Sequence, residues 1–209
     1  MIQILPDVWE TEVESPFPGL TTHAYLVIRR SGNVLFYNTG HTRELDRMEA
    51  LGGVTYQFLS HRDELGESLK AICQRFGTKL GGHVREQGEF ARICAPDILF
   101  DQREVLLGNI EVIPTPGHTP GSTCFLVHSA HGQRYLFTGD TLYLGDDGTW
   151  KPGLLAGSDK DALSESLRLL RELKPDVAFS SAFGGEYGYQ DVSADWLERV
   201  QQALDQLRG

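Results

Sequence analysis

Apolar residues along this chain follow two spacings, which alternate several times. Short apolar runs bounded by turn-forming residues are typical of strands. They are expected at residues 8–13, 24–28, 34–37, 54–59, 79–82, 98–113, 123–127, 135–138 and 176–179. The polar segment 29–33 separates two of these runs and predicts a hairpin.

Other segments carry apolar residues at helical spacing. Helices are expected at residues 64–76, 86–93, 158–173 and 193–207. Ser158 and Asp161 resemble a capping box for the third helix, with Asp replacing the usual Glu. Each half of the chain has strands first and a helix later, which indicates two packed sheets with helices outside. The longest irregular stretch, residues 145–157, is a candidate functional loop.

Composition and charge restrict the class of protein. A chain of 209 residues with 40% hydrophobic and 23% charged residues fits one domain spanning residues 1–209. A net charge of -10 repels phosphate backbones, so nucleic acid is not an expected partner. The three cysteines form no CxxC pair, and there is neither a signal-peptide pattern nor a long apolar run. We expect a cytoplasmic protein with a small-molecule substrate and no membrane partner.

Two segments place single polar residues on turns that follow strands. The sequence Thr-Pro-Gly-His-Thr-Pro-Gly-Ser at residues 115–122 holds His118 on a rigid turn, where it could bind a metal. A surface turn that happens to contain histidine is the alternative. Asp140 follows the strand at 135–138 and could bind a cation, although Gly-Asp is also a common turn.

A third segment joins a strand to a helix. The apolar run ends at Leu59, and His61, Asp63 and Glu64 stand at the entry to the helix. Capping of the helix explains the two carboxylates. It does not explain His61.

These three segments, in this order, resemble the metallo-β-lactamase superfamily, whose hydrolytic members include glyoxalase II. Residues 115–122 resemble its third metal-ligand loop, and residues 139–141 resemble the loop of its bridging aspartate. Residues 38–40, Asn-Thr-Gly, stand for the usual Asp-Thr-Gly. The resemblance covers nearly the whole chain. It implies a mixed α/β (α+β) fold, a four-layer αββα sandwich with a metal site at one edge between the sheets.

The chain departs from the family's signature loop, His-x-His-x-Asp-His. If His61 takes the first histidine, Asp63 replaces the second, Leu65 the aspartate and Gly66 the last histidine. If His61 takes the second histidine, Asp63 keeps the aspartate and Glu64 replaces the last histidine. The first alignment is preferred, because family strands also end in Ser-His or Thr-His before the loop. The final family histidine is missing as well, since the matching stretch 180–186 contains none.

The resemblance implies four metal ligands: His61, Asp63, His118 and Asp140. Two imidazoles and two carboxylates suit one divalent ion, Zn²⁺ first, with Fe²⁺ or Mn²⁺ as alternatives. A second ion is not expected, because its ligands are missing. Asp140 is also expected to act in catalysis through the metal. Glu64 is the first candidate for a general base, with a helix-dipole role as the alternative.

The predicted function is that of a metal-dependent hydrolase acting on a small ester, thioester or lactone-like substrate. One alternative is a non-catalytic binding or regulatory protein that keeps the fold. Another is an iron-dependent oxidoreductase like the superfamily's di-iron branch. Tyr143 and Trp150 follow Asp140 in a region that borders substrate in the family, and core packing is their alternative role.

Overall fold

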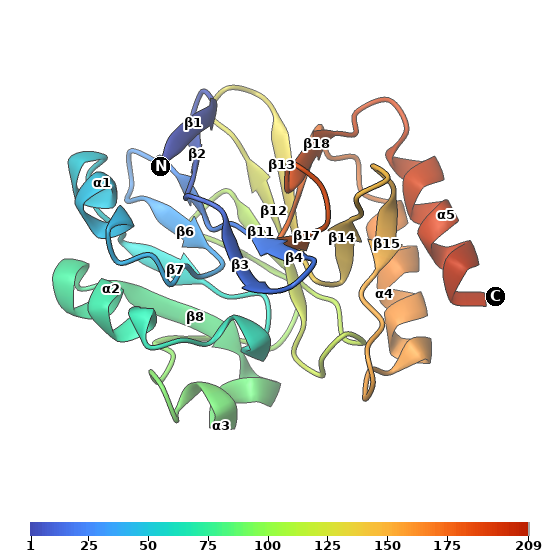
Figure 1. Ribbon diagram of the computed structural model, residues 1–209, viewed down its shortest axis with the longest axis horizontal. Coiled ribbons are helices and arrows are strands. Elements are labelled where there is room, and N and C mark those ends of the chain that lie inside the picture. The colour runs from blue at the N-terminus through green and yellow to red at the C-terminus, as the bar shows by residue number, and fades with distance from the viewer. Residues whose placement is uncertain (209) are drawn as a thin grey trace.

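The computed structural model describes residues 1–208, and the chain forms helical layers on both sides of packed sheets (Figure 1). The helices are α1 (Glu44–Ala50), α2 (Ser68–Phe76), α3 (Gln87–Phe90), α4 (Lys160–Arg171) and α5 (Trp196–Arg208). Helices α1 to α3 lie on one side and α4 and α5 on the other. The predicted four-layer αββα sandwich is confirmed.

The first sheet has seven strands in the order β1-β2-β5-β6-β7-β8-β9. Their bounds are β1 (Ile2–Leu5), β2 (Val8–Glu10), β5 (Tyr25–Val27), β6 (Val34–Phe36), β7 (Tyr56–Phe58), β8 (Lys79–His83) and β9 (Ile98–Phe100). The segment 29–33 joins β5 to β6, and these two strands are antiparallel, as the predicted hairpin requires. Strands β6 to β9 are parallel.

The second sheet has six strands in the order β10-β11-β12-β13-β16-β18. They are β10 (Glu104–Leu106), β11 (Ile110–Pro114), β12 (Thr123–His128), β13 (Arg134–Gly139), β16 (Val177–Ser180) and β18 (Tyr189–Asp191). A five-stranded sheet follows beside it in the order β15-β14-β17-β4-β3, and β14 contacts both β13 and β16. Its strands are β3 (Glu14–Phe17), β4 (Leu20–Thr22), β14 (Leu142–Leu144), β15 (Trp150–Pro152) and β17 (Ala182–Phe183).

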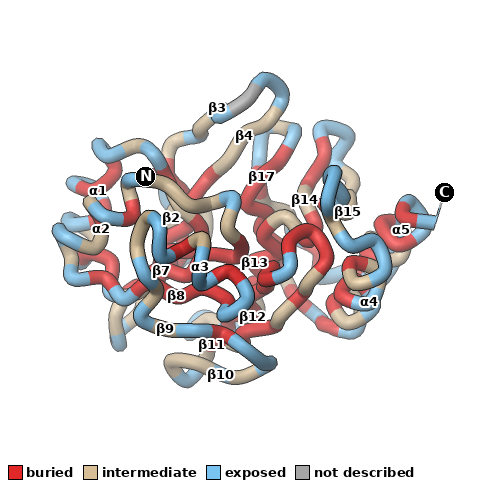
Figure 2. Tube along the Cα trace, turned by 90° about the horizontal axis from the view of Figure 1, so that it is seen from below, coloured by how far each residue is buried: buried red, intermediate tan, exposed pale blue. Residues whose placement is uncertain are grey.

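Successive side chains along β12 and β13 point to opposite faces of the second sheet, so a hydrophobic core lies on each side of it. Phe125 and Phe137 point toward the first sheet, where the Phe137 ring stacks on Phe36 with centroids 4.0 Å apart. Their neighbours Leu126 and Leu136 point the other way, against α4 and α5. Full burial of an apolar side chain of this size stabilises the folded state by about 1.5–3 kcal/mol relative to an exposed one. Figure 2 shows the buried segments along the sheets and the exposed ones on outer turns.

The predicted capping box at the start of α4 is wrong. The helix begins at Lys160, and its cap is Asp159, whose Oδ1 accepts hydrogen bonds from the backbone amides of Asp161 and Ala162. Ser158 is not available, because its hydroxyl donates to the backbone carbonyl of His118 at 3.0 Å. The serine therefore joins the helix entry to the loop that carries the histidine.

The topology brings the three candidate segments to one edge. Strands β11 and β13 both pair antiparallel with β12, so their carboxyl ends, followed by His118 and Asp140, meet at the same edge. His61 follows β7 in the facing sheet. A backbone hydrogen bond of 2.9 Å from Thr123 to Ser60 joins the two sheets there. Among residues 1–208, no helix has the length and apolar character needed to cross a membrane.

Candidate metal centre

His61, Asp63 and His118 bring one ligand atom each to within 4.8 Å of one another, and the fourth predicted ligand, Asp140, faces both histidines. Nε2 of His61 lies 3.5 Å from Oδ2 of Asp140 and 3.9 Å from Oδ2 of Asp63. Nε2 of His118 lies 3.8 Å and 3.7 Å from the same two oxygens. Ligands about 2.0–2.1 Å from a tetrahedral zinc ion are about 3.4 Å apart. The separations therefore fit a single divalent ion.

Both imidazoles present an unpartnered nitrogen to this point. His61 is 2% exposed and His118 is 6% exposed, and Nε2 of each is buried with no hydrogen-bond partner. A buried polar atom without a partner costs free energy. A cation bound between these nitrogens and the carboxylates would satisfy both atoms, so the residues present fit a metal ion.

The other nitrogen of each ring fixes the tautomer. Nδ1 of His118 lies 2.7 Å from the carbonyl oxygen of Gly153, which can only accept, so Nδ1 carries the proton. Nδ1 of His61 lies 2.8 Å from the hydroxyl of Ser60, which donates its own proton to Glu64. The serine oxygen therefore accepts from His61. In both rings Nε2 is therefore the nitrogen that is left to bind a metal ion.

Surplus negative charge at the point favours a bound positive charge. Burial by itself would lower the pKa of His61, but Asp140 and Glu64 outweigh it and raise that pKa well above its usual value. Burial would raise the pKa of Asp140, yet His61 brings it below its usual value. The same carboxylates thus attract a proton or a metal ion to this place.

Asp140 is oriented from behind by the backbone of β17. Its Oδ1 accepts a hydrogen bond of 3.2 Å from the amide of Ala182, which leaves Oδ2 to face the histidines. The neighbouring Phe183 is buried and stacks on His23 with ring centroids 5.1 Å apart. The segment that lacks the family's final histidine therefore contributes a backbone donor and an apolar support.

Glu64 lies on the opposite side of the His61 ring from Asp140. Its side chain is 6% exposed, and Oε2 accepts a hydrogen bond of 2.9 Å from the Ser60 amide. Its Oε1 accepts from the Ser60 hydroxyl and lies 3.4 Å from Nδ1 of His61. These contacts hold the carboxylate on the Nδ1 side of the ring. Its role as a base stays a prediction.

Two glycines allow the loops to approach this closely. A Cβ atom at Gly153 would lie 1.7 Å from the backbone oxygen of Asp140, and one at Gly139 would lie 2.2 Å from the Ser60 hydroxyl. Gly139 also has a φ of 54°, which favours glycine. Ser60 and Gly153 were not predicted as site residues, because no local pattern shows that a serine hydroxyl or a backbone carbonyl will meet a histidine ring.

A cavity of about 930 Å³ opens beside the centre. His61, Asp63 and Asp140 line it together with apolar residues of β4, α2 and the loop after β15. Neither Trp150 nor Tyr143 lines it. Trp150 is 1% exposed, donates from Nε1 to Gln190 and packs edge-on against Trp196, so core packing is its role.

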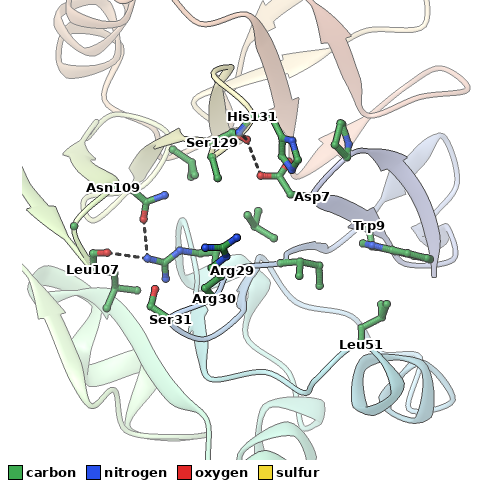
Figure 3. Close-up of a pocket in the computed structure, with 16 residues that line it drawn as sticks. Asp7, Trp9, Arg29, Arg30, Ser31, Leu51, Leu107, Asn109, Ser129 and His131 are labelled. Carbon is green, nitrogen blue, oxygen red and sulfur yellow. Dashed lines mark hydrogen bonds between the residues drawn. The ribbon is translucent and has the colours of Figure 1, made fainter.

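A second cavity, of about 940 Å³, lies at the opposite edge of the sandwich. Arg29, Arg30 and His131 line it, on the turns that join β5 to β6 and β12 to β13 (Figure 3). The Arg29 guanidinium is engaged by the carbonyl of Leu107 and the side-chain oxygen of Asn109. Arg29 and Arg30 thus line this cavity, whereas no lysine or arginine lines the cavity beside the metal centre.

Comparisons with known proteins find similar sequences and similar structures. The sequence model of the Metallo-beta-lactamase superfamily matches residues 74–182. A hydroxyacylglutathione hydrolase of Hydrogenovibrio crunogenus is 35% identical over 108 residues, which are 51% of this chain and 35% of that protein. A probable hydroxyacylglutathione hydrolase of Schizosaccharomyces pombe is 32% identical over 87 residues, 36% of this chain and 34% of that protein. The chain thus spans about a third of the length of these curated relatives.

Solved structures share the fold. A metallo-beta-lactamase from Pontibacter korlensis superposes with a TM-score of 0.76 at 20% identity, covering 100% of this chain and 98% of that one. At this identity the likeness establishes the arrangement of helices and strands, and the chemistry has to be argued from the site itself.

Proposed function

The chain belongs to the metallo-beta-lactamase superfamily, and on that premise we propose that it is a metal-dependent hydrolase of a small ester, thioester or lactone-like substrate. The observation that carries the proposal is the pair of buried, unpartnered Nε2 atoms of His61 and His118, which face the Oδ2 atoms of Asp63 and Asp140. We propose these four residues as the ligands of one Zn²⁺ ion.

A bound divalent ion supplies a Lewis acid that polarises a carbonyl oxygen and lowers the pKa of water. The chain supplies the rest. His61 and His118 present fixed lone pairs, and Asp140 is oriented by the amide of Ala182. Asp63, whose side chain is 56% exposed, faces the open side toward the cavity. The cavity holds the acyl group beside the centre and excludes part of the solvent.

Glu64 fits the role of a positioning residue better than that of a base. Its carboxylate receives the Ser60 proton, and the Ser60 oxygen receives the proton of His61 Nδ1. Such outer hydrogen bonds fix the orientation of a ligating imidazole and increase its basicity. If Glu64 only stabilised the dipole of the helix, it would not need these hydrogen bonds to Ser60.

Metal content measured by elemental mass spectrometry tests the proposal. The purified protein should hold about one zinc ion per chain, and His118→Ala should lose it. His128→Ala is the matched control, because His128 is exposed at the far end of β12. The metal-loaded protein should then hydrolyse simple thioesters, and His118→Ala should not.

Two outcomes of these measurements would distinguish the alternative functions of the site. Absence of metal in the wild-type protein, even after reconstitution with Zn²⁺, Fe²⁺ or Mn²⁺, contradicts the hydrolase. Metal without hydrolysis of any ester or thioester favours the non-catalytic binding protein with a structural cation.

A further inference from the structure

The cavity beside the metal centre is lined by carboxylates and by no lysine or arginine among the described residues. Five acidic residues contribute to its wall: Glu14, Asp63, Glu64, Glu67 and Asp140. A divalent ion at the centre offsets two of these five negative charges. Two cations outside the wall offset part of the rest, since Lys70 pairs with Glu67 at 2.8 Å and Arg62 lies 4.0 Å from Asp63. The cavity therefore keeps an excess of negative charge with the metal bound.

Glu14 differs from the other four wall carboxylates, because each of those pairs with a histidine or a lysine. It stands on β3, and its oxygens accept hydrogen bonds from the backbone amide of Gly40 at 2.9 Å and from the hydroxyl of Thr39. These donors are neutral and fix its position without cancelling its charge. None of the ion pairs among residues 1–208 includes Glu14.

The rest of the wall is largely apolar. Leu20, Ala71 and Leu155 line it, together with Pro16 and Leu65. Apolar surface of this kind binds hydrocarbon groups and contributes no positive charge that could pair with an anion. The positive side chains Arg29 and Arg30 lie at the opposite edge.

We infer that the substrate is a neutral or amine-bearing ester or thioester with an apolar acyl group, and that Glu14 determines this preference. The inference rests on the proposed hydrolase function and narrows its substrate class. Glutathione thioesters carry two carboxylates against one ammonium group, and phosphodiesters carry one negative charge, so the net negative charge of both would be repelled from this cavity. The chain would then differ in substrate from the hydroxyacylglutathione hydrolases to which it is similar.

Three butyryl thioesters that differ in the charge of the thiol test the inference. The thiols are thiocholine, which is cationic, N-acetylcysteamine, which is neutral, and 3-mercaptopropionate, which is anionic. With zinc-loaded protein at low ionic strength, kcat/KM for the cationic substrate should exceed that for the anionic one by about tenfold or more. The ratio should shrink in about 0.5 M salt, because salt screens exposed charges.

Glu14→Gln keeps the hydrogen-bond acceptor but removes the charge, so it should reduce the ratio severalfold. Glu198→Gln is the matched control, since it makes the same change of net charge on exposed α5 and should leave the ratio unchanged. If Glu14→Gln fails to fold by circular dichroism, Glu67→Gln takes its place, because that side chain is 74% exposed. Equal or faster hydrolysis of the anionic thioester by the wild-type protein overturns the inference.

A binding measurement distinguishes failure of this inference from failure of the proposed hydrolase reaction. If none of the three thioesters is hydrolysed, the hydrolase proposal fails. Calorimetric titration with butyramides bearing a trimethylammonium or a carboxylate group then tests the charge preference alone. Tighter binding of the ammonium compound, weakened in Glu14→Gln, supports the inference, and tighter binding of the carboxylate contradicts it.

Discussion

Nδ1 of His118 donates a hydrogen bond to the carbonyl oxygen of Gly153, 2.7 Å away. The two residues belong to different loops, one after β11 and the other after β15. The bond fixes both the rotation of the imidazole and its tautomer, and it therefore determines that Nε2 faces the centre as an acceptor. A loop that had seemed irregular in sequence thus orients a predicted metal ligand.

Gly153→Ala should disturb the centre from outside its ligand set. The added Cβ would lie 1.7 Å from the backbone oxygen of Asp140 and 3.1 Å from Nδ1 of His118, so the loop has to move. Loss of such an outer hydrogen bond costs about 10- to 100-fold in metal affinity. Competition with a zinc chelator measures the change. Gly88→Ala is the control, because nothing lies within 4 Å of a Cβ there, and unchanged affinity in both variants would contradict the prediction.

Glu64→Gln distinguishes a positioning residue from a general base. A positioning role predicts a weaker metal affinity, by about tenfold or more, and a kcat that recovers when zinc is saturating. Ser60→Ala should behave in the same way, because it interrupts the same hydrogen-bond chain. A base would instead show normal zinc affinity, a reduced kcat at saturating zinc and loss of the acidic limb of the pH–rate profile.

The sequence predicted the site residues that lie in short motifs next to their strands. His118 and Asp140 stand in short Gly-rich turns after strands, and their spacing from those strands is visible in the chain. Helix α1 was missed, because only Leu45 and Met48 represent its apolar face over seven residues. A pattern that short does not distinguish a helix from a loop.

Contacts between distant segments could not be predicted from the chain. Ser158 looked like a helix cap, but its hydroxyl bonds to the loop of His118, and the adjacent Asp159 caps the helix. Local propensity allows each of these residues several partners, and the tertiary fold selects one.

Tyr37 joins the two sheets behind the centre, and Tyr37→Phe should destabilise the fold. The buried hydroxyl accepts a hydrogen bond from the Gly139 amide and donates one to the Phe179 carbonyl, each 2.9 Å long. Phenylalanine keeps the ring packing but leaves the amide without a partner, at a cost of about 1–3 kcal/mol. Urea unfolding of the metal-free protein measures the loss. Tyr143→Phe is the control, because that hydroxyl makes no such bonds, and equal stability of both variants would argue against the bridge.

Glu10 should make the fold less stable as pH rises, and Glu10→Gln should remove that effect. The side chain is 12% exposed, Oε2 has no hydrogen-bond partner, and His23 is 3.9 Å away. Burial raises the pKa of Glu10 from 4.5 to about 7, so the folded protein keeps a proton that the unfolded chain loses between these values. The stability that this group contributes is therefore complete below pH 4.5 and is lost as pH rises through 7.

Urea unfolding should show Glu10→Gln close to wild type at pH 4.5 and more stable by on the order of 2 kcal/mol at pH 8. The exposed Glu198→Gln should show no gap at either pH, and a gap for Glu10→Gln that is the same at both would refute the assignment.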